Sequence, residues 1–134
     1  MAIRIGPIGA VAVVLAAMSP AAAEEAADPN MQGHCMASFI FFMALSKTAI
    51  DAGRVDASDL PFYQTLAFAA EQYWHRTRDE VDAASVEHHD TVVAFYESEL
   101  VRYRSFATGG GEISLVTQAD EVGGCARALG YLDD

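Results

Sequence analysis

Residues 31–50, MQGHCMASFIFFMALSKTAI, decide the fold of this chain. Apolar and small side chains recur here at helical spacing, and residues 36–45 are apolar on almost every side. A helix that is apolar all round is buried on several sides. The run of residues 36–45 is shorter than the roughly 20 residues that cross a bilayer. We therefore predict a buried core helix that is capped by Asp28, has Pro29 in its first turn and ends at Gly53.

A second helix follows the polar turn at residues 54–59, with Pro61 tolerated in its first turn. Its predicted buried stripe follows the helical period closely and comprises Phe62, Leu66, Ala69, Ala70, Tyr73, Thr77, Val81 and Ala84. No glycine or proline occurs from there to Gly109, but a small domain cannot cover a single helix of that length. We place a break between residues 82 and 90, where Ser85 can cap a third helix. The predicted buried face of the third helix is Val92, Tyr96, Leu100, Tyr103 and Ala107.

The triglycine at 109–111 predicts a turn before the last helix. Thr117 and Asp120 have the spacing of a capping-box variant, so we expect the last helix to open there and to stop at Gly130. Gly123 and Gly124 weaken a helix, and a close backbone approach to the first helix is the expected compensation. The predicted fold class is all-α, with four helices in an up-down bundle or a less regular packing.

The first 23 residues resemble a secretory signal peptide in pattern. Arg4 supplies the basic region, residues 8–18 the apolar run and Ala21–Ala23 a cleavage site of small residues. An uncleaved anchor is the alternative, but Pro20 breaks the apolar run. We thus expect a signal peptide at 1–23, a flexible lead-in at 24–30 and one helical domain at 31–134. The expected location is periplasmic or secreted, without membrane insertion after cleavage.

Two cysteines, Cys35 and Cys125, lie near the two ends of the expected mature chain. An even cysteine count in an exported protein favours a disulfide, here between the first and last helices. A metal pair or a reactive thiol is the alternative, although no Cys-x-x-Cys spacing supports either.

The chain has 8 basic and 19 acidic residues and a formal net charge of −11. This charge repels nucleic acid and anionic membrane surfaces. It either serves only to keep the chain soluble or favours a basic protein as partner.

The four histidines give no metal motif in the sequence. Adjacent His88 and His89 point about 100° apart on a helix, so they cannot aim at one ion and are expected to be solvated. Glu71 and His75 have i,i+4 spacing, but no second histidine has a carboxylate at that spacing. Covalent attachment of haem needs the motif Cys-x-x-Cys-His, which the sequence lacks. A nucleophilic serine or cysteine site needs a nucleophile elbow such as Gly-x-Ser-x-Gly or a cysteine paired with a base, and the sequence contains neither pattern. We expect no metal, no cofactor and no catalytic residues.

The predicted function is that of a non-catalytic protein that binds another protein, as inhibitors, immunity proteins and stress chaperones do. The interface candidates are Trp74, His75 and Arg78, because a half-buried tryptophan beside polar residues is a typical interface anchor, although an ordinary core edge has the same pattern. The alternative is a helical bundle that binds a small apolar ligand or cofactor between its helices. Its cavity would be lined by Phe39, Phe42, Met43, Leu66 and Tyr96.

Overall fold

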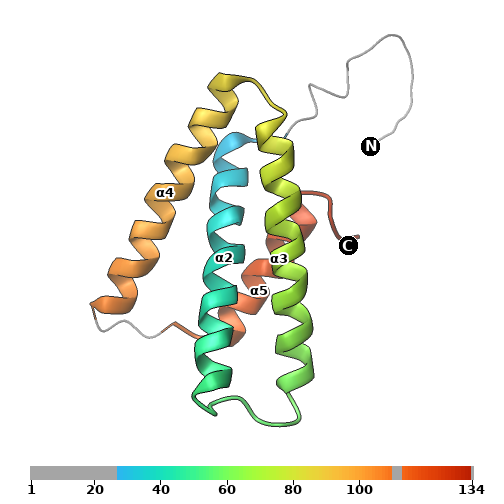
Figure 1. Ribbon diagram of the computed structural model, residues 1–134, viewed down its shortest axis with the longest axis vertical. Helices are drawn as coiled ribbons and strands as arrows, with labels where there is room; N and C mark the ends of the chain where they lie inside the picture. Colours follow the sequence, from blue (N-terminus) through green and yellow to red (C-terminus); the bar gives the residue numbers. More distant parts are fainter. Residues whose placement is uncertain (1–26, 110–112, 134) are drawn as a thin grey trace.

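The computed structural model of the protein describes residues 27–109 and 113–133, and these form four α-helices (Figure 1). The helices are labelled as in Figure 1: α2 (Pro29–Asp51), α3 (Leu60–Asp82), α4 (Val86–Thr108) and α5 (Leu115–Ala128). Successive helices run in opposite directions. The prediction of an all-α fold is confirmed, whereas the signal peptide predicted at 1–23 lies outside the described residues.

Helix α2 is the centre of the molecule, and α3, α4 and α5 all pack on it (Figure 1). It is surrounded because its apolar residues point in every direction, and two buried positions at its start, Gln32 and Gly33, extend its contacts to α4. By length and composition α2 could span a membrane, a test that the buried core helix of a soluble protein also passes. The packing is that of a four-helix bundle, with one central helix and three around it.

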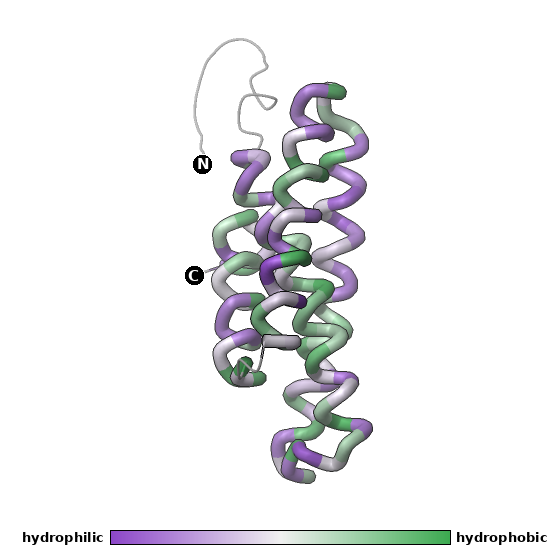
Figure 2. Tube along the Cα trace, turned by 90° about the vertical axis from the view of Figure 1, so that its left-hand side faces the viewer, coloured by the Kyte–Doolittle hydropathy of each residue, from purple (hydrophilic) through white to green (hydrophobic). Residues whose placement is uncertain are grey.

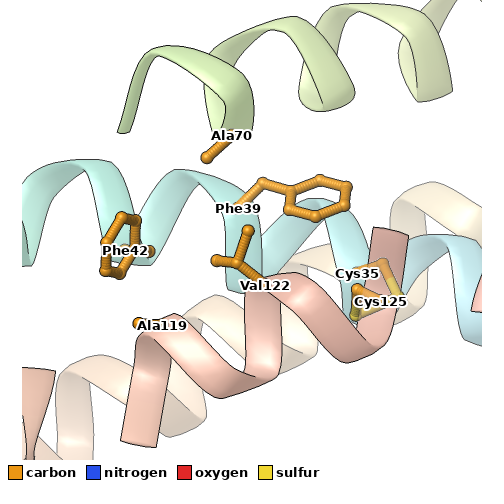
Figure 3. Packing of buried hydrophobic residues seen from close by; sticks show 7 residues of the cluster. All are labelled: Cys35, Phe39, Phe42, Ala70, Ala119, Val122 and Cys125. Atoms are coloured by element: carbon orange, nitrogen blue, oxygen red, sulfur yellow. A yellow bond between two sulfur atoms is a disulfide. The ribbon is translucent and has the colours of Figure 1, made fainter. Parts of the chain in front are cut away.

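The core consists of two clusters along α2. The larger joins α2 to α3 and α5 and contains Cys35, Phe39, Phe42, Ala70, Ala119, Val122 and Cys125 (Figure 3). Phe39 and Phe42 are fully buried in this cluster. The smaller cluster joins α2 to the α3–α4 turn through Met36, Val81 and Val92.

The helix ends are largely as predicted. The Asp28 side chain accepts a hydrogen bond from the Asn30 amide at the start of α2, and Gly53 follows the helix with φ at 71°. The predicted break between α3 and α4 is confirmed, and Ser85 caps α4 by accepting from the His88 amide. The predicted start of the last helix at Thr117 is wrong. Ser114 is the cap, because its side chain accepts from the Thr117 amide and Leu115 packs on the core.

The close backbone approach lies in α2 and not in α5. A methyl group placed on Gly33 would lie 2.8 Å from the Val92 carbonyl oxygen and 3.0 Å from the Tyr96 nitrogen of α4. Gly124 has open space around it, and Gly123 faces only the Arg127 side chain. The predicted role of Gly123 and Gly124 in contacting the first helix is therefore wrong, and Gly33 brings α2 and α4 together instead.

The exposed ends of α3 and α4 also differ from the predicted stripes. Phe62 was placed on the buried face of α3, yet 58% of it is exposed, and Ala107 of α4 is exposed as well. At the start of α3 the next residue, Tyr63, packs against the larger cluster in place of Phe62, whereas Ala107 lies beyond Tyr103, the last buried residue of α4. Figure 2 shows the end of the α2–α3 hairpin projecting beyond the other helices, with hydrophobic and hydrophilic residues mixed along it.

Candidate functional site

Cys35 of α2 and Cys125 of α5 form a disulfide, with 5.5 Å between their Cα atoms. The predicted link between the first and last helices is confirmed, and the bond fits an exported protein. Both cysteines are buried in the larger core cluster (Figure 3). The bond therefore also fixes which faces of α2 and α5 oppose each other.

A polar cluster lies beside the disulfide and joins three helices. The His34 ring of α2 lies between two carboxylates: its Nδ1 is 2.7 Å from Glu99 Oε1 of α4, and its Nε2 is 2.8 Å from Glu121 Oε2 of α5. Glu99 also accepts two hydrogen bonds from the Arg102 guanidinium, both at 3.0 Å. We call these four residues the His34 cluster.

The His34 cluster favours one protonation state. Both partners of the ring are carboxylate oxygens, and a histidine donates from both nitrogens only when it is protonated. Burial lowers the pKa of His34, but hydrogen bonds and charge attraction from Glu121 and Glu99 outweigh it, so the pKa lies above the usual 6.5. Hydrogen bonding to Arg102, opposed by burial and helped by His34, lowers the pKa of Glu99 to about 2.

The His34 cluster predicts a pH-dependent stability. The folded pKa of His34 is raised, so its contribution is complete below pH 6.5 and is lost as pH rises through the folded pKa. The folded pKa of Glu99 is lowered, so its contribution is present above its ordinary 4.5 and is lost as pH falls toward 2. We expect His34→Gln to lower the melting temperature near pH 5.5 and to have a much smaller effect near pH 9.

Thermal melts of the wild type and His34→Gln at both pH values check this prediction. The matched control is His75→Gln, because His75 is about half exposed and its nearest carboxylate oxygen is 4.0 Å away. An equal loss of stability from His34→Gln at both pH values would contradict a protonated His34.

The sequence did not reveal the His34 cluster. Only the pairing of Glu99 with Arg102, three residues apart, is visible in the pattern. The missed signal was the position of His34 beside Cys35 and of Glu121 one helical turn before Cys125. Once the cysteines are bonded, the two polar residues must lie close together.

The predicted interface residues lie together on α3. Trp74 packs against both core clusters, and its indole Nε1 is buried without a partner among the described residues. The His75 ring meets it edge-on at 5.2 Å, and the Arg78 guanidinium lies 5.5 Å from its ring centre. Because Trp74 is partly core, only His75 and Arg78 offer substantial surface to a partner.

The residues predicted to line a ligand cavity lie in packed regions. Phe39 and Phe42 are core, Met43 and Leu66 pack against the same cluster, and Tyr96 packs against the smaller one. None of the five lines the surface hollows described below. His88 is not a solvated side chain as predicted, because its Nε2 is bonded to the buried Gln32 Oε1 of α2.

Toward its C-terminal end α4 diverges from α2 (Figure 1), and a hollow lies between the two helices there. The two helices are held together as far as Tyr103, which stacks on Phe41 with ring centres 4.4 Å apart and forms a hydrogen bond with Ser38. Below this pair lies a hollow of about 410 Å³. Its walls include Phe41, Ala44, Leu45, Thr48, Ala107 and Ile113, which define the α2–α4 groove.

Two further hollows adjoin the α2–α4 groove and share Ile113 with it. One of about 330 Å³ is lined by Tyr103, Phe106 and Gln118, and one of about 400 Å³ by Leu45, Ala49 and Arg54. Gln118 is buried, and its Oε1 has no partner among the described residues. The apolar residues Val101, Phe106 and Val116 are more than half exposed on the neighbouring helix surfaces. The three hollows are open depressions lined by both apolar and polar side chains.

No known protein family, curated protein sequence or solved structure matches this chain.

Proposed function

We propose that this chain is a non-catalytic exported protein, periplasmic or secreted, that binds another protein in the α2–α4 groove. The observation that carries the proposal is the apolar face of α2 that α4 leaves uncovered below Phe41 and Tyr103. Contiguous exposed apolar surface of this kind marks interaction sites in soluble proteins.

The shape of the groove favours a protein segment over a small ligand. Sites for small molecules enclose most of the ligand surface, whereas the core of this bundle is filled by Phe39 and Phe42. Three open hollows that adjoin one another at Ile113 instead suit neighbouring side chains of one bound segment, as in the helix-in-groove mode of recognition.

Charge adds a constraint on the partner. The net charge of −11 attracts a protein of net positive charge at long range. The groove region is lined by apolar side chains such as Leu45 and Ala107 and by polar ones such as Arg54 and Thr48. The expected partner is therefore a basic protein that inserts apolar side chains, with Arg54 placed to meet a carboxylate or a carbonyl of that segment.

Site-directed photo-crosslinking in an envelope extract tests the proposal. A crosslinker at position 106, on the groove side, is compared with one at position 68 on α3, where Phe68 is 64% exposed. We expect one protein to crosslink from position 106 and not from position 68. The same protein should be lost with Phe106→Asp and retained with Phe68→Asp, since both substitutions alter exposed side chains of the same type.

Other outcomes assign the interface differently. Loss of the partner with Arg78→Glu but not with Phe106→Asp would place the interface on α3, at the residues predicted from the sequence. A stoichiometric small molecule released on denaturation, with no crosslinked protein, would favour the ligand-binding alternative and contradict the proposal.

A further inference from the structure

The His34 cluster and the disulfide together bring three metal-ligating side chains to one place. A ring nitrogen of His34, a carboxylate oxygen of Glu121 and the Sγ of Cys125 all lie within 4.8 Å of one another. Cys35 is next to His34 on α2, so it points about 100° away from it, and its Sγ is bonded to Cys125 Sγ. Thiolate, imidazole and carboxylate groups are the ligands that Zn²⁺ takes in proteins, and water completes a site with three protein ligands.

The Nδ1 side of the His34 ring has the carboxylate partner that metal-binding histidines usually have. A histidine that binds a metal through one nitrogen usually donates the proton of the other nitrogen to a carboxylate, which fixes the ring. Here Nδ1 faces Glu99 at 2.7 Å, and Glu99 is itself held by Arg102. Nε2 is thereby aimed at Glu121 and the cysteine pair.

We propose that the chain binds one Zn²⁺ through His34, Glu121 and Cys125, with water as the fourth ligand, when the two cysteines are reduced. Zinc bonds of about 2.0–2.3 Å place tetrahedral ligand atoms about 3.3–3.8 Å apart, so a shift of about 1 Å brings the three ligand atoms to these separations. The disulfide and the ion exclude each other, because a bonded sulfur is not a thiolate. The oxidised chain offers only His34 and Glu121 and does not hold the ion.

The interconversion balances with a dithiol as reductant. The dithiol passes two electrons to the disulfide and becomes a cyclic disulfide, and its two thiol hydrogens end on Cys35 and Cys125. Zn²⁺ then displaces the thiol proton of Cys125 and the Nε2 proton of His34, while Glu99 keeps its hydrogen bond to Nδ1. Because both cysteines are buried, the zinc form is reached most directly when the chain folds before oxidation.

Refolding of the reduced full chain tests this proposal. The chain is unfolded, reduced with a phosphine and refolded with or without Zn²⁺, and Co²⁺ replaces Zn²⁺ as a spectroscopic probe. We expect one Co²⁺ per chain, with the ultraviolet charge-transfer band of a thiolate ligand, and displacement of Co²⁺ by Zn²⁺. The oxidised chain should show neither the band nor binding.

Variants separate the site from non-specific binding. His34→Gln and Glu121→Gln should each weaken Zn²⁺ binding about tenfold or more. Glu99→Gln replaces a positioning residue and should weaken Zn²⁺ binding about 10- to 100-fold. His88→Gln is the matched control, because it removes another histidine bonded between α2 and α4 and should leave the affinity unchanged. Equal affinity of His34→Gln and the wild type overturns the proposal.

Folding of the reduced chain is followed in the same samples by circular dichroism. If the reduced chain is unfolded without metal, one equivalent of Zn²⁺ should restore its helix content, since metal binding is then coupled to folding. Failure of Zn²⁺ to bind, whether or not the chain is helical, overturns the proposal. The outcome does not depend on the α2–α4 groove.

Discussion

Cys125→Ser is expected to lower the stability of the oxidised protein more than any other single change proposed for this chain. The disulfide closes a sequence separation of 90 residues, and in the chain-entropy model a loop of that length contributes about 4 to 5 kcal/mol. The variant also leaves Cys35 unpaired in a fully buried position. We expect the melting temperature to fall by at least several degrees.

The measurement is a thermal melt with and without reductant. Reduced wild type and the double variant Cys35→Ser/Cys125→Ser should melt together, well below the oxidised wild type. The double variant is the control for the lone thiol of Cys125→Ser. If Cys125→Ser melts at the temperature of the oxidised wild type, then the disulfide does not stabilise the protein.

The elements of the fold could be predicted from local patterns. The all-round apolar character of residues 36–45 indicates a central helix, and Asp28, Ser85, Gly53 and Gly130 mark helix ends through short-range chemistry. Such signals act within a few residues and are therefore readable without a tertiary structure. The disulfide could be predicted because only two cysteines were present.

The incorrect predictions concern positions whose burial or capping depends on tertiary packing. Phe62 continues the apolar stripe of α3, but the next residue, Tyr63, packs against the core there and the Phe62 side chain is exposed. Ser114 rather than Thr117 caps α5 because Leu115 can pack on the core and so adds a turn to the helix. Periodicity gives the face of a helix, but not how much of that face another helix covers.

The His34 cluster shows how one tertiary contact supplies the missing information. His34, Glu99 and Glu121 come from three helices, and no sequence spacing relates the three. The disulfide sets the register of α2 against α5, and helix geometry then places His34 and Glu121 on the adjoining faces. The position of Glu99 depends in addition on how closely α4 approaches α2, which is set at Gly33.

Gly33→Ala and Gly124→Ala are expected to change stability in opposite directions. Each replaces a glycine within a helix, and the gain in helix propensity is up to about 1 kcal/mol in either case. Gly124 has no atom within 4 Å of the added methyl group, so Gly124→Ala should show that gain and raise the melting temperature.

At Gly33 the added methyl group meets the backbone of α4, where two of its three nearest atoms are the Val92 oxygen at 2.8 Å and the Tyr96 nitrogen at 3.0 Å. Backbone atoms cannot rotate away, so α2 and α4 must separate. Overpacking typically costs about 1–3 kcal/mol, which outweighs the propensity gain where the obstacle is backbone. We expect Gly33→Ala to lower the melting temperature, at about 4–8 °C per kcal/mol for a domain of this size.

Separation of α2 from α4 also has a consequence at the His34 cluster. Moving α4 outward lengthens the contact between Glu99 and His34, whereas Glu121 stays in place because the disulfide holds α5. In Gly33→Ala the stability difference from the wild type should therefore be larger near pH 5.5 than near pH 9, as for His34→Gln. Melts of Gly33→Ala and Gly124→Ala at both pH values check this, and a stabilised Gly33→Ala would show that α4 does not approach α2 as closely in solution.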